Sequence, residues 1–243
     1  MRKSALITGA SRGIGRALAM KYAEKGYDIA ISCRRQEEKL LEAAKEIRTL
    51  GADCITYMGD MGAEEDVEEF FRQIHQQHEQ IDLLINNAGI SHIGLLQDMT
   101  AREWDEILAA NLRSVFLCSR AVIPGMLSSK TGKILSISSV WGNAGASMEV
   151  AYSTTKGAVN AFTKALAKEL APSNIQVNAI ACGMIDTDMN RCFSPEDISR
   201  ITEEIPSGRM GTPREVAELA YQITQKNHYL TGQIITLDGG WIS

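Results

Sequence analysis

The sequence lacks the cysteine patterns that mark disulfide-rich, metal-binding and thiol-redox proteins. Its five cysteines are Cys33, Cys54, Cys118, Cys182 and Cys192. They form no C-x-x-C pair and have no metal-ligand spacing with the four histidines. We therefore predict no metal site and expect free thiols in a reducing compartment. The cytoplasm is the expected location.

Long apolar runs and basic clusters are also missing. Met1, Arg2 and Lys3 lead directly into a short apolar segment, without the apolar region of a signal peptide. No apolar run reaches the roughly 18 residues that a membrane helix needs, so we predict no membrane association. The 25 Lys and Arg residues are scattered and the net charge is −5, which argues against nucleic acid as a partner.

Strand-like and helix-like patterns alternate along the chain. Its 243 residues, 44% of them hydrophobic, fit one globular domain covering 1–243. The alternation predicts parallel βαβ units with right-handed crossovers. The expected strands are 4–8, 28–33, 54–58, 81–85, 134–139, 175–180 and 233–237. The expected helices are a stretch that ends at Lys25, 36–50, 63–78, 100–128 with a break at Pro124, 152–170 and one that begins at Pro213. A loop with a short helix after Pro195 is expected from 181 to about 210.

A glycine-rich turn follows the first expected strand and opens the first helix. Its pattern is Thr8-Gly9-x-x-x-Gly13-x-Gly15. Gly9 permits a tight turn, while Gly13 and Gly15 let the backbone approach a pyrophosphate, which the free N–H groups at the helix N-terminus stabilise. The order of strand, turn and helix predicts a dinucleotide site. The alternative is a turn that is merely rich in glycine.

The end of the second expected strand bears on the choice between NAD and NADP. An NAD enzyme places Asp or Glu there to bind the ribose 2′-hydroxyl. Here Cys33 is followed by Arg34 and Arg35. We expect Arg34 and Arg12 to bind a 2′-phosphate, which predicts NADP(H). The alternative is that Arg34 and Arg35 only cap a surface turn. Asp60, at the end of the third strand, is expected either to accept from the adenine amino group or to cap a helix.

Tyr152 and Lys156 are spaced by one helical turn, so their side chains leave the same face of a helix. An ammonium group beside a phenol stabilises the phenolate and lowers the phenol pKa. Tyr152 is therefore a candidate acid–base group near neutral pH. A solvated pair on a helix surface is the alternative. The strand at 134–139 ends in Ser138 and Ser139, at the edge where an open α/β sheet gathers ligand groups.

Together with Asn86-Asn87-Ala88-Gly89 and Asn111, these motifs resemble the classical short-chain dehydrogenases/reductases. The resemblance covers essentially the whole chain. It implies an α/β fold: a single-domain Rossmann fold with a doubly wound, seven-stranded parallel sheet in the order 3-2-1-4-5-6-7 and helices on both faces. It also implies a substrate loop at about 183–210 and a homotetramer. The apolar residues that cover most of the helix at 152–170 independently suggest a partner on its second side, although the preceding helix is an alternative cover.

The resemblance assigns catalysis to Asn111, Ser139, Tyr152 and Lys156. NADPH would deliver hydride to a ketone while Tyr152 protonates the alkoxide, with Ser139 on the carbonyl oxygen, Lys156 favouring the tyrosinate and Asn111 in a proton relay through water. The residues expected to bind the cofactor are Gly9, Ser11, Arg12, Gly13, Ile14, Gly15, Arg34, Asp60, Met61, Asn87, Ala88, Gly89, Tyr152, Lys156, Ile185 and Thr187. Those expected to contact the substrate are Ser139, Trp141, Glu149, Tyr152 and Gly183.

Within the family, the segments 208–213 and 231–240 resemble 3-oxoacyl-[acyl-carrier-protein] reductases of fatty-acid biosynthesis. Those enzymes use basic residues at the mouth of the site to bind the carrier protein; Lys130 is one candidate, and Ser173 departs from the pattern. Cys182 stands where the family commonly has Pro, which predicts a less stiff loop and a packed thiol. The chain end at Trp241 and Ile242 is expected at an interface.

Three alternatives stay open at the level of sequence. The segments 141–149 and 185–190 are similar to 5-aminopentanone reductases that modify elongation factor P, in which case Glu149 would pair with a substrate ammonium. Glu149 is otherwise a solvated loop charge. A hydroxysteroid or sugar-alcohol dehydrogenase is a second alternative. The third, from a different class, is a catalytically silent NADP-binding regulator, which the intact Ser139, Tyr152 and Lys156 disfavour.

Overall fold

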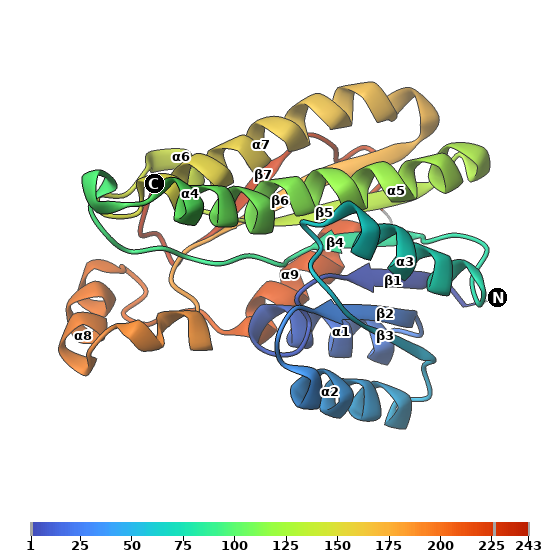
Figure 1. Cartoon of the computed structure of the whole chain (residues 1–243), viewed down its shortest axis with the longest axis horizontal. Helices are drawn as coiled ribbons and strands as arrows, with labels where there is room; N and C mark the ends of the chain where they lie inside the picture. Colours follow the sequence, from blue (N-terminus) through green and yellow to red (C-terminus); the bar gives the residue numbers. More distant parts are fainter. Residues whose placement is uncertain (1, 226, 243) are drawn as a thin grey trace.

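The computed structural model describes residues 2–225 and 227–242, without the side chains of Arg191 and Cys192. In this part of the chain, seven strands form one parallel sheet in the order β3-β2-β1-β4-β5-β6-β7 (Figure 1). The strands are β1 (Ser4–Ile7), β2 (Asp28–Cys33), β3 (Cys54–Met58), β4 (Leu83–Asn86), β5 (Gly132–Ser139), β6 (Ile175–Cys182) and β7 (Ile234–Leu237). This is the predicted fold class, and the prediction is confirmed.

Helices cover both faces of the sheet (Figure 1). The α-helices are α1 (Gly13–Glu24), α2 (Glu37–Thr49), α3 (Glu64–His75), α4 (Ala101–Leu108), α5 (Ser114–Ser129), α6 (Trp141–Ala144), α7 (Val150–Leu170), α8 (Pro195–Glu204) and α9 (Pro213–Thr224). The short turns are η1 (Leu96–Asp98), η2 (Ala109–Arg113), η3 (Ala171–Ser173) and η4 (Asp188–Cys192).

Two hydrophobic clusters hold the three layers together. One joins the sheet to α1, α2 and α9, and the other joins it to α3, α5 and α7. In β1, Ile7 belongs to the first cluster and its neighbour Leu6 to the second, and both are fully buried. Successive strand residues point to opposite faces, so a strand covered on both sides is apolar throughout. This burial explains why the sheet strands were recognisable as short continuous apolar runs.

The predicted break at Pro124 is wrong, because α5 continues through it to Ser129. Pro124 cannot donate to the carbonyl of Arg120. Val122 and Met126, on either side of the proline, are buried in the second cluster, and their packing holds the helix together. A π-helical turn, η2, joins α4 to α5, which the sequence did not reveal.

The continuous helix Ala101–Ser129 is long and apolar enough, by length and composition, to cross a membrane. The stretch contains no long unbroken apolar run, because polar residues interrupt it. Its most apolar window is 44% buried inside the protein, and the core helix of a globular protein satisfies the same test. The helix is therefore weak evidence for a membrane span.

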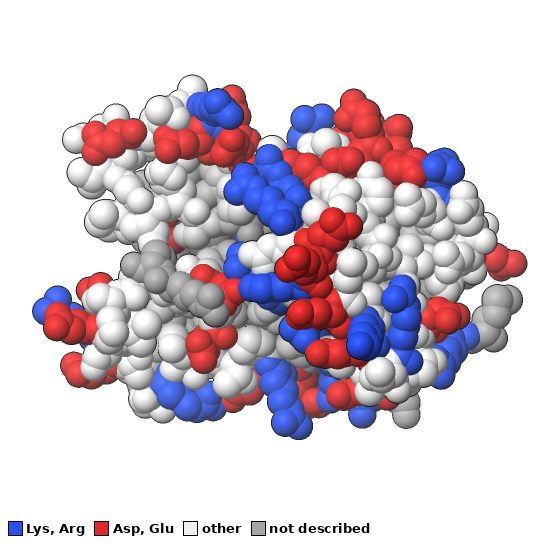
Figure 2. All heavy atoms as spheres, turned by 60° about the horizontal axis from the view of Figure 1, so that its bottom comes forward, with Lys and Arg blue, Asp and Glu red and all other residues white. Residues whose placement is uncertain are grey.

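Charges of both signs lie interleaved on the face of the molecule shown in Figure 2.

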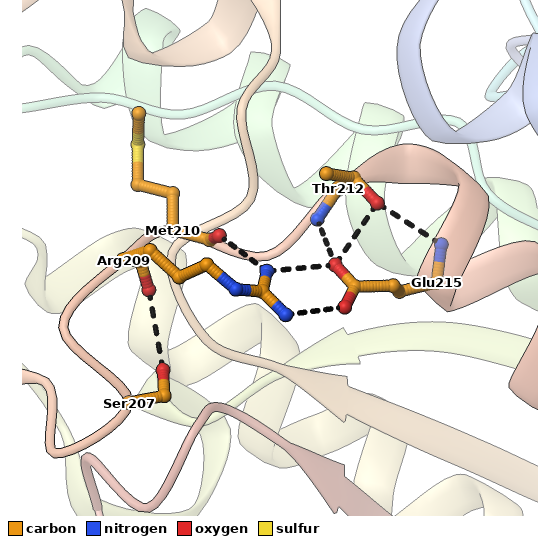
Figure 3. Close-up of polar contacts among 5 residues, drawn as sticks. All are labelled: Ser207, Arg209, Met210, Thr212 and Glu215. Carbon is orange, nitrogen blue, oxygen red and sulfur yellow. Dashed lines mark hydrogen bonds and ion pairs between the residues drawn. The ribbon is translucent and has the colours of Figure 1, made fainter.

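The segment after β6 leaves the sheet, carries η4 and α8, and returns at α9 (Figure 1). Its first residues pair with its last: Gly211 N donates to Met184 O at 2.9 Å, and Asp186 N donates to Gly211 O at 2.9 Å. Figure 3 shows how the return is fixed. Arg209 binds both carboxylate oxygens of Glu215, at 2.6 and 3.0 Å, and Glu215 also accepts from Thr212 N and Oγ1. The two ends of the segment are thus tied together beside the sheet.

Thr212 is the N-cap of α9, and its Oγ1 accepts from Glu215 N at 3.2 Å. We predict that Thr212→Ala lowers the free energy of unfolding by about 1 kcal/mol, because the first turn of α9 loses its side-chain acceptor. Urea denaturation measures the change. Ser194→Ala removes the matching cap of α8, in which the described residues include no buried one, so we expect a smaller loss. Equal losses at the two caps would contradict the view that α9 is integral to the fold and α8 peripheral.

Candidate active site

A cavity of about 710 Å³ opens at the carboxyl ends of the strands. Every residue predicted to bind cofactor or substrate lines this cavity, from the glycine-rich turn to the segment after β6. Asn111 is the one predicted catalytic residue that does not line the cavity. It is buried beneath the lining residues. Parallel strands place the ends of distant segments at one edge, which is where such folds bind their ligands.

The glycine-rich turn is built for close approach. Gly9 has a φ of +66°, and a Cβ there would lie 2.8 Å from Ala88 Cα. A Cβ on Gly15 would collide with the carbonyl oxygen of Gly9 and lie 2.5 Å from Asn87 Nδ2. Asn87 Nδ2 donates to Thr8 O at 2.9 Å and to Gly9 O at 3.0 Å. The glycines therefore pack the turn against the segment after β4, a role for Gly15 that the sequence reading did not include.

The N-terminus of α1 faces this turn. Its N-cap, Arg12, makes no side-chain capping bond, and no acidic residue lies in the first turn. Gly13 has a φ of +55°, and its nearest contact for a Cβ is Thr187 Cγ2 at 3.4 Å. Backbone N–H groups at such a terminus attract an anion. The turn therefore fits the pyrophosphate of a dinucleotide.

Two buried polar atoms near the end of β2 support the same fit. Ser32 Oγ and Gln36 Oε1 have no hydrogen-bond partner among the described residues, although both residues line the cavity. Buried polar atoms are nearly always paired, so these two are available to a ligand. Sequence reasoning missed both residues. For Ser32, the signal available in the sequence was a polar residue near the end of a buried strand.

Both arginines predicted to bind a 2′-phosphate are paired with carboxylates. Arg34 Nε lies 3.1 Å from Asp60 Oδ2, and Arg12 Nη1 donates to Asp188 Oδ2 at 2.8 Å. Asp60 Oδ1 also accepts from Gly62 N at 2.9 Å, so this carboxylate holds the turn between β3 and α3. The capping alternative for Asp60 is wrong, because the N-cap of α3 is Ala63 and no side chain caps it. Met61, beside Asp60, is buried.

Tyr152 and Lys156 lie on α7 as predicted, but their electrostatics differ from the prediction. Lys156 Nζ is 5.5 Å from the centroid of the Tyr152 ring and donates to Ile137 O at 2.8 Å. Burial raises the pKa of Tyr152 above its usual range, and a hydrogen bond with Ser139 only partly opposes this rise. Burial also lowers the pKa of Lys156 to about 8. The prediction of a lowered pKa for Tyr152 is wrong in its net direction, because burial outweighs the other influences on the phenol.

The two serines at the end of β5 have different surroundings. Ser138 Oγ donates to Asn160 Oδ1 at 2.6 Å inside the fold. Ser139 Oγ accepts from Trp141 N at 3.2 Å and hydrogen-bonds with Tyr152. Ser139 is therefore the serine that shares the site with the phenol, in agreement with the resemblance.

Asn111 belongs to the π-helical turn and is 1% exposed. Its Nδ2 donates to Ile90 O at 2.9 Å and to Thr155 Oγ1 at 3.1 Å, and its Oδ1 accepts from Ile90 N at 2.8 Å. A Cβ on Gly89 would lie 3.2 Å from Asn111 Oδ1 and 3.7 Å from Lys156 Nζ. The missing side chain of Gly89 leaves room between these two groups. A proton relay through water at this point remains a proposal.

Trp141, Trp241 and Glu149 also line the cavity. Trp141 packs edge-on against Trp241, with ring centroids 5.0 Å apart. Trp241, expected at an interface, therefore lines the cavity of its own chain. Ser91 Oγ donates to Glu149 Oε1 at 2.9 Å. Burial raises the pKa of Glu149, while hydrogen bonds from Ser91 and Trp141 oppose the rise. Glu149 is therefore a partly buried, hydrogen-bonded carboxylate at the N-cap of α7.

Cys182 lies between the catalytic groups and the segment that follows β6. Its thiol is buried, and burial raises its pKa to about 12, so it is neutral. This is the packed thiol that we expected. Cys33, Cys54 and Cys118 are likewise free and buried, and the thiol predicted at Cys192 lies outside the described side chains.

A Cβ on Gly183 would lie 2.7 Å from Asp238 Cβ, so glycine lets the segment after β6 pass the end of β7. Among the described residues, no cluster of three or more His, Cys, Asp or Glu is arranged for a metal ion.

Lys130 does not lie at the mouth of the cavity. It follows α5 in the left-handed region, with a φ of 52°, and its carbonyl accepts from Asn174 Nδ2 at 3.2 Å. Ser173 is the neighbour of that asparagine, and both positions precede the strands whose far ends form the cavity. The expectation that Lys130 flanks the site is therefore wrong within one chain.

Comparison with known proteins agrees with this geometry. The family model for short chain dehydrogenases matches residues 3–197. An uncharacterized oxidoreductase from Bacillus subtilis is 39% identical over 243 residues, 99% of each chain. A 3-oxoacyl-[acyl-carrier-protein] reductase from Staphylococcus epidermidis is 37% identical over 241 residues, also 99% of each. The structure of a putative gluconate dehydrogenase from Agrobacterium tumefaciens superimposes with a TM-score of 0.94 at 32% identity, over 99% of this chain and 96% of that one. The chain therefore belongs to the short-chain dehydrogenase family of oxidoreductases.

Proposed function

We propose that this protein reduces a ketone to a secondary alcohol with NADPH. The observation that carries the proposal is the Tyr152 phenol, which lies beside the Ser139 hydroxyl and one helical turn from Lys156, in a cavity that begins at the glycine-rich turn. A phenol between a hydroxyl and an ammonium group can act as the general acid in reduction, because the positive charge of Lys156 stabilises the phenolate that forms. The bound cofactor supplies the hydride.

The residues of the chain handle the oxygen and its proton. Ser139 donates a hydrogen bond to the ketone oxygen, and Tyr152 gives its proton to the oxygen as negative charge develops there. The ammonium of Lys156, held by Ile137 O, stabilises the phenolate that remains. Lys156 has a pKa of about 8 and is therefore largely protonated at neutral pH, when this charge is needed.

We further propose NADP(H) as the cofactor, a cytoplasmic location and a homotetramer. Arg34 and Arg12 at the cavity support the cofactor choice, since neither the carboxyl end of β2 nor the turn at 34–36 offers a carboxylate for a ribose 2′-hydroxyl. Ala161 and Ala165 on α7 and Phe116 on α5 stay exposed in the single chain. An exposed apolar surface of this kind supports a partner copy.

The names of the bacterial relatives support a 3-oxoacyl thioester carried by an acyl carrier protein as the substrate. The test is consumption of NADPH by the purified protein with an acetoacetyl thioester, with NADH in parallel. We expect turnover with NADPH and little with NADH. If the protein fails to reduce the thioester but reduces another ketone, the proposed 3-oxoacyl substrate is contradicted, while the proposed reduction of a ketone is not.

Glu149 favours a second candidate, the aminopentanone group on a modified lysine of elongation factor P. Its half-buried carboxylate faces the cavity one helical turn from Tyr152, and no Lys, Arg or His of the described residues pairs with it. A carboxylate in such a position is stabilised by a cationic ligand. A ketone that carries a primary ammonium would supply that cation.

We predict that Glu149→Gln raises the KM for a free aminopentanone by roughly tenfold, because the ammonium loses one charge-assisted hydrogen bond. The KM for an acetoacetyl thioester should not rise, since that substrate brings no cation. Glu203→Gln, at an exposed position of α8, is the matched control and should change neither value. Equal effects of Glu149→Gln on the two substrates would contradict this second candidate.

A further inference from the structure

Asp188 joins three segments around the cofactor end of the cavity. Its Oδ2 accepts from Arg12 Nη1 at 2.8 Å and lies 3.5 Å from Lys39 Nζ. Arg12 precedes α1, Lys39 belongs to α2, and Asp188 opens η4 in the segment after β6. The Asp188 side chain is 18% exposed, whereas Arg12 and Lys39 are 47% and 44% exposed. We call this pair of ion pairs the Asp188 clasp.

The clasp occupies Arg12, a cation at the cavity that a 2′-phosphate would need, and Lys39, which lies next to Asp188 but does not line the cavity. Arg12 and Asp188 both line the cavity, together with Arg34 and Gln36 near the end of β2. Arg34 is held in the same manner by Asp60, at 3.1 Å. A phosphate brings about two negative charges and seeks guanidinium donors. Beside Asp188 it would meet a like charge, so the phosphate and the carboxylate compete for Arg12 and Lys39.

We infer that Asp188 is a specificity-determining residue for the cofactor, which discriminates against a 2′-phosphate by holding Arg12 and Lys39. The inference rests on the proposed use of NADP(H). Binding of NADPH breaks the clasp and frees the start of η4 from the glycine-rich turn, whereas NADH leaves the clasp closed. The preference for NADPH is thereby smaller than the arginines alone would give. Because Asp188 opens η4, the preference is also coupled to the position of the segment after β6.

The test measures the dissociation constants of NADP⁺ and NAD⁺ by isothermal titration calorimetry, without any substrate. In Asp188→Asn we expect the ratio of the NAD⁺ to the NADP⁺ dissociation constant to rise about three- to tenfold, the worth of two partly exposed ion pairs. Asp186→Asn is the matched control: it removes the same charge two positions away, at an exposed residue whose backbone N donates to Gly211 O. The control should leave the ratio unchanged.

A second arm tests whether Asp188 acts through Arg12. In an Arg12→Gln background, Asp188→Asn should change the ratio less than in the wild-type background, because partners in one ion pair are not additive. An unchanged ratio in Asp188→Asn, or an equal rise in Asp186→Asn, would overturn the inference. Wild-type protein that binds NADP⁺ no better than NAD⁺ would contradict the proposed cofactor instead, and the effect of Asp188→Asn on the ratio would still decide the role of Asp188.

Discussion

Tyr152→Phe should abolish ketone reduction while the protein stays folded and still binds the cofactor. The substitution removes one hydroxyl group and keeps the ring against which Lys156 lies, 5.5 Å from the centroid. General acid catalysis is worth roughly 10²–10⁴-fold in rate, so kcat should fall by about that factor. Binding of the cofactor should change little, because the lost proton acts in the chemical step. Steady-state kinetics and a cofactor titration measure the two quantities separately.

The control for this variant is Tyr229→Phe, which removes the same hydroxyl from a fully exposed tyrosine. It should leave kcat and cofactor binding at their wild-type values. Turnover of Tyr152→Phe at the rate of the wild type would show that another group protonates the product. A loss of both turnover and folding would be seen by circular dichroism, and Ser139→Ala, which retains the phenol, would then test the same site.

Arg34→Asp should move the cofactor preference from NADPH toward NADH. The variant removes one charge-assisted bond to the 2′-phosphate, worth about 1.5–3 kcal/mol, or roughly tenfold to 100-fold in affinity. In the wild type, Arg34 Nε lies 3.1 Å from Asp60 Oδ2. The variant loses this ion pair and places a second carboxylate beside Asp60. The ratio of kcat/KM for the two cofactors is the measured quantity.

Lys45→Asp is the matched control for Arg34→Asp. Lys45 is an exposed residue of α2 and does not line the cavity, so the same change of charge there should leave the ratio unaltered. If Arg34→Asp also leaves the ratio unaltered, then Arg34 binds Asp60 and not the cofactor. The alternative of a capped surface turn would then stand.

The strands were predictable because local sequence decides them. The limits of β2 and β3 agree with the prediction. Each is a short run between turn residues; β2 is buried throughout, and β3 is buried at Cys54 and Ile55. Thr212 and Pro213 likewise mark the start of α9 through capping and a fixed φ. The glycine-rich turn and the Tyr152–Lys156 spacing are also local patterns, and they identified the cavity.

Contacts between distant residues were not predictable. Arg12 and Asp188 are 176 positions apart, and the sequence alone does not reveal that they meet. The pKa of Tyr152 depends on burial by the whole fold, so a local argument from Lys156 gave the wrong direction. The contact of Trp241 with Trp141 and the hydrogen bond of Ser91 with Glu149 were not predictable for the same reason, because segments far apart in the chain bring these residues together.

Hydride transfer to a ketone is the central claim, and an isotope label tests it most directly. The protein would be supplied with NADPH that carries deuterium at the transferable position of the nicotinamide, together with either an acetoacetyl thioester or an aminopentanone. The account predicts a secondary alcohol that contains the deuterium on its carbinol carbon, formed by the wild type and not by Tyr152→Phe. An alcohol without the label, or no alcohol from either ketone, would contradict it.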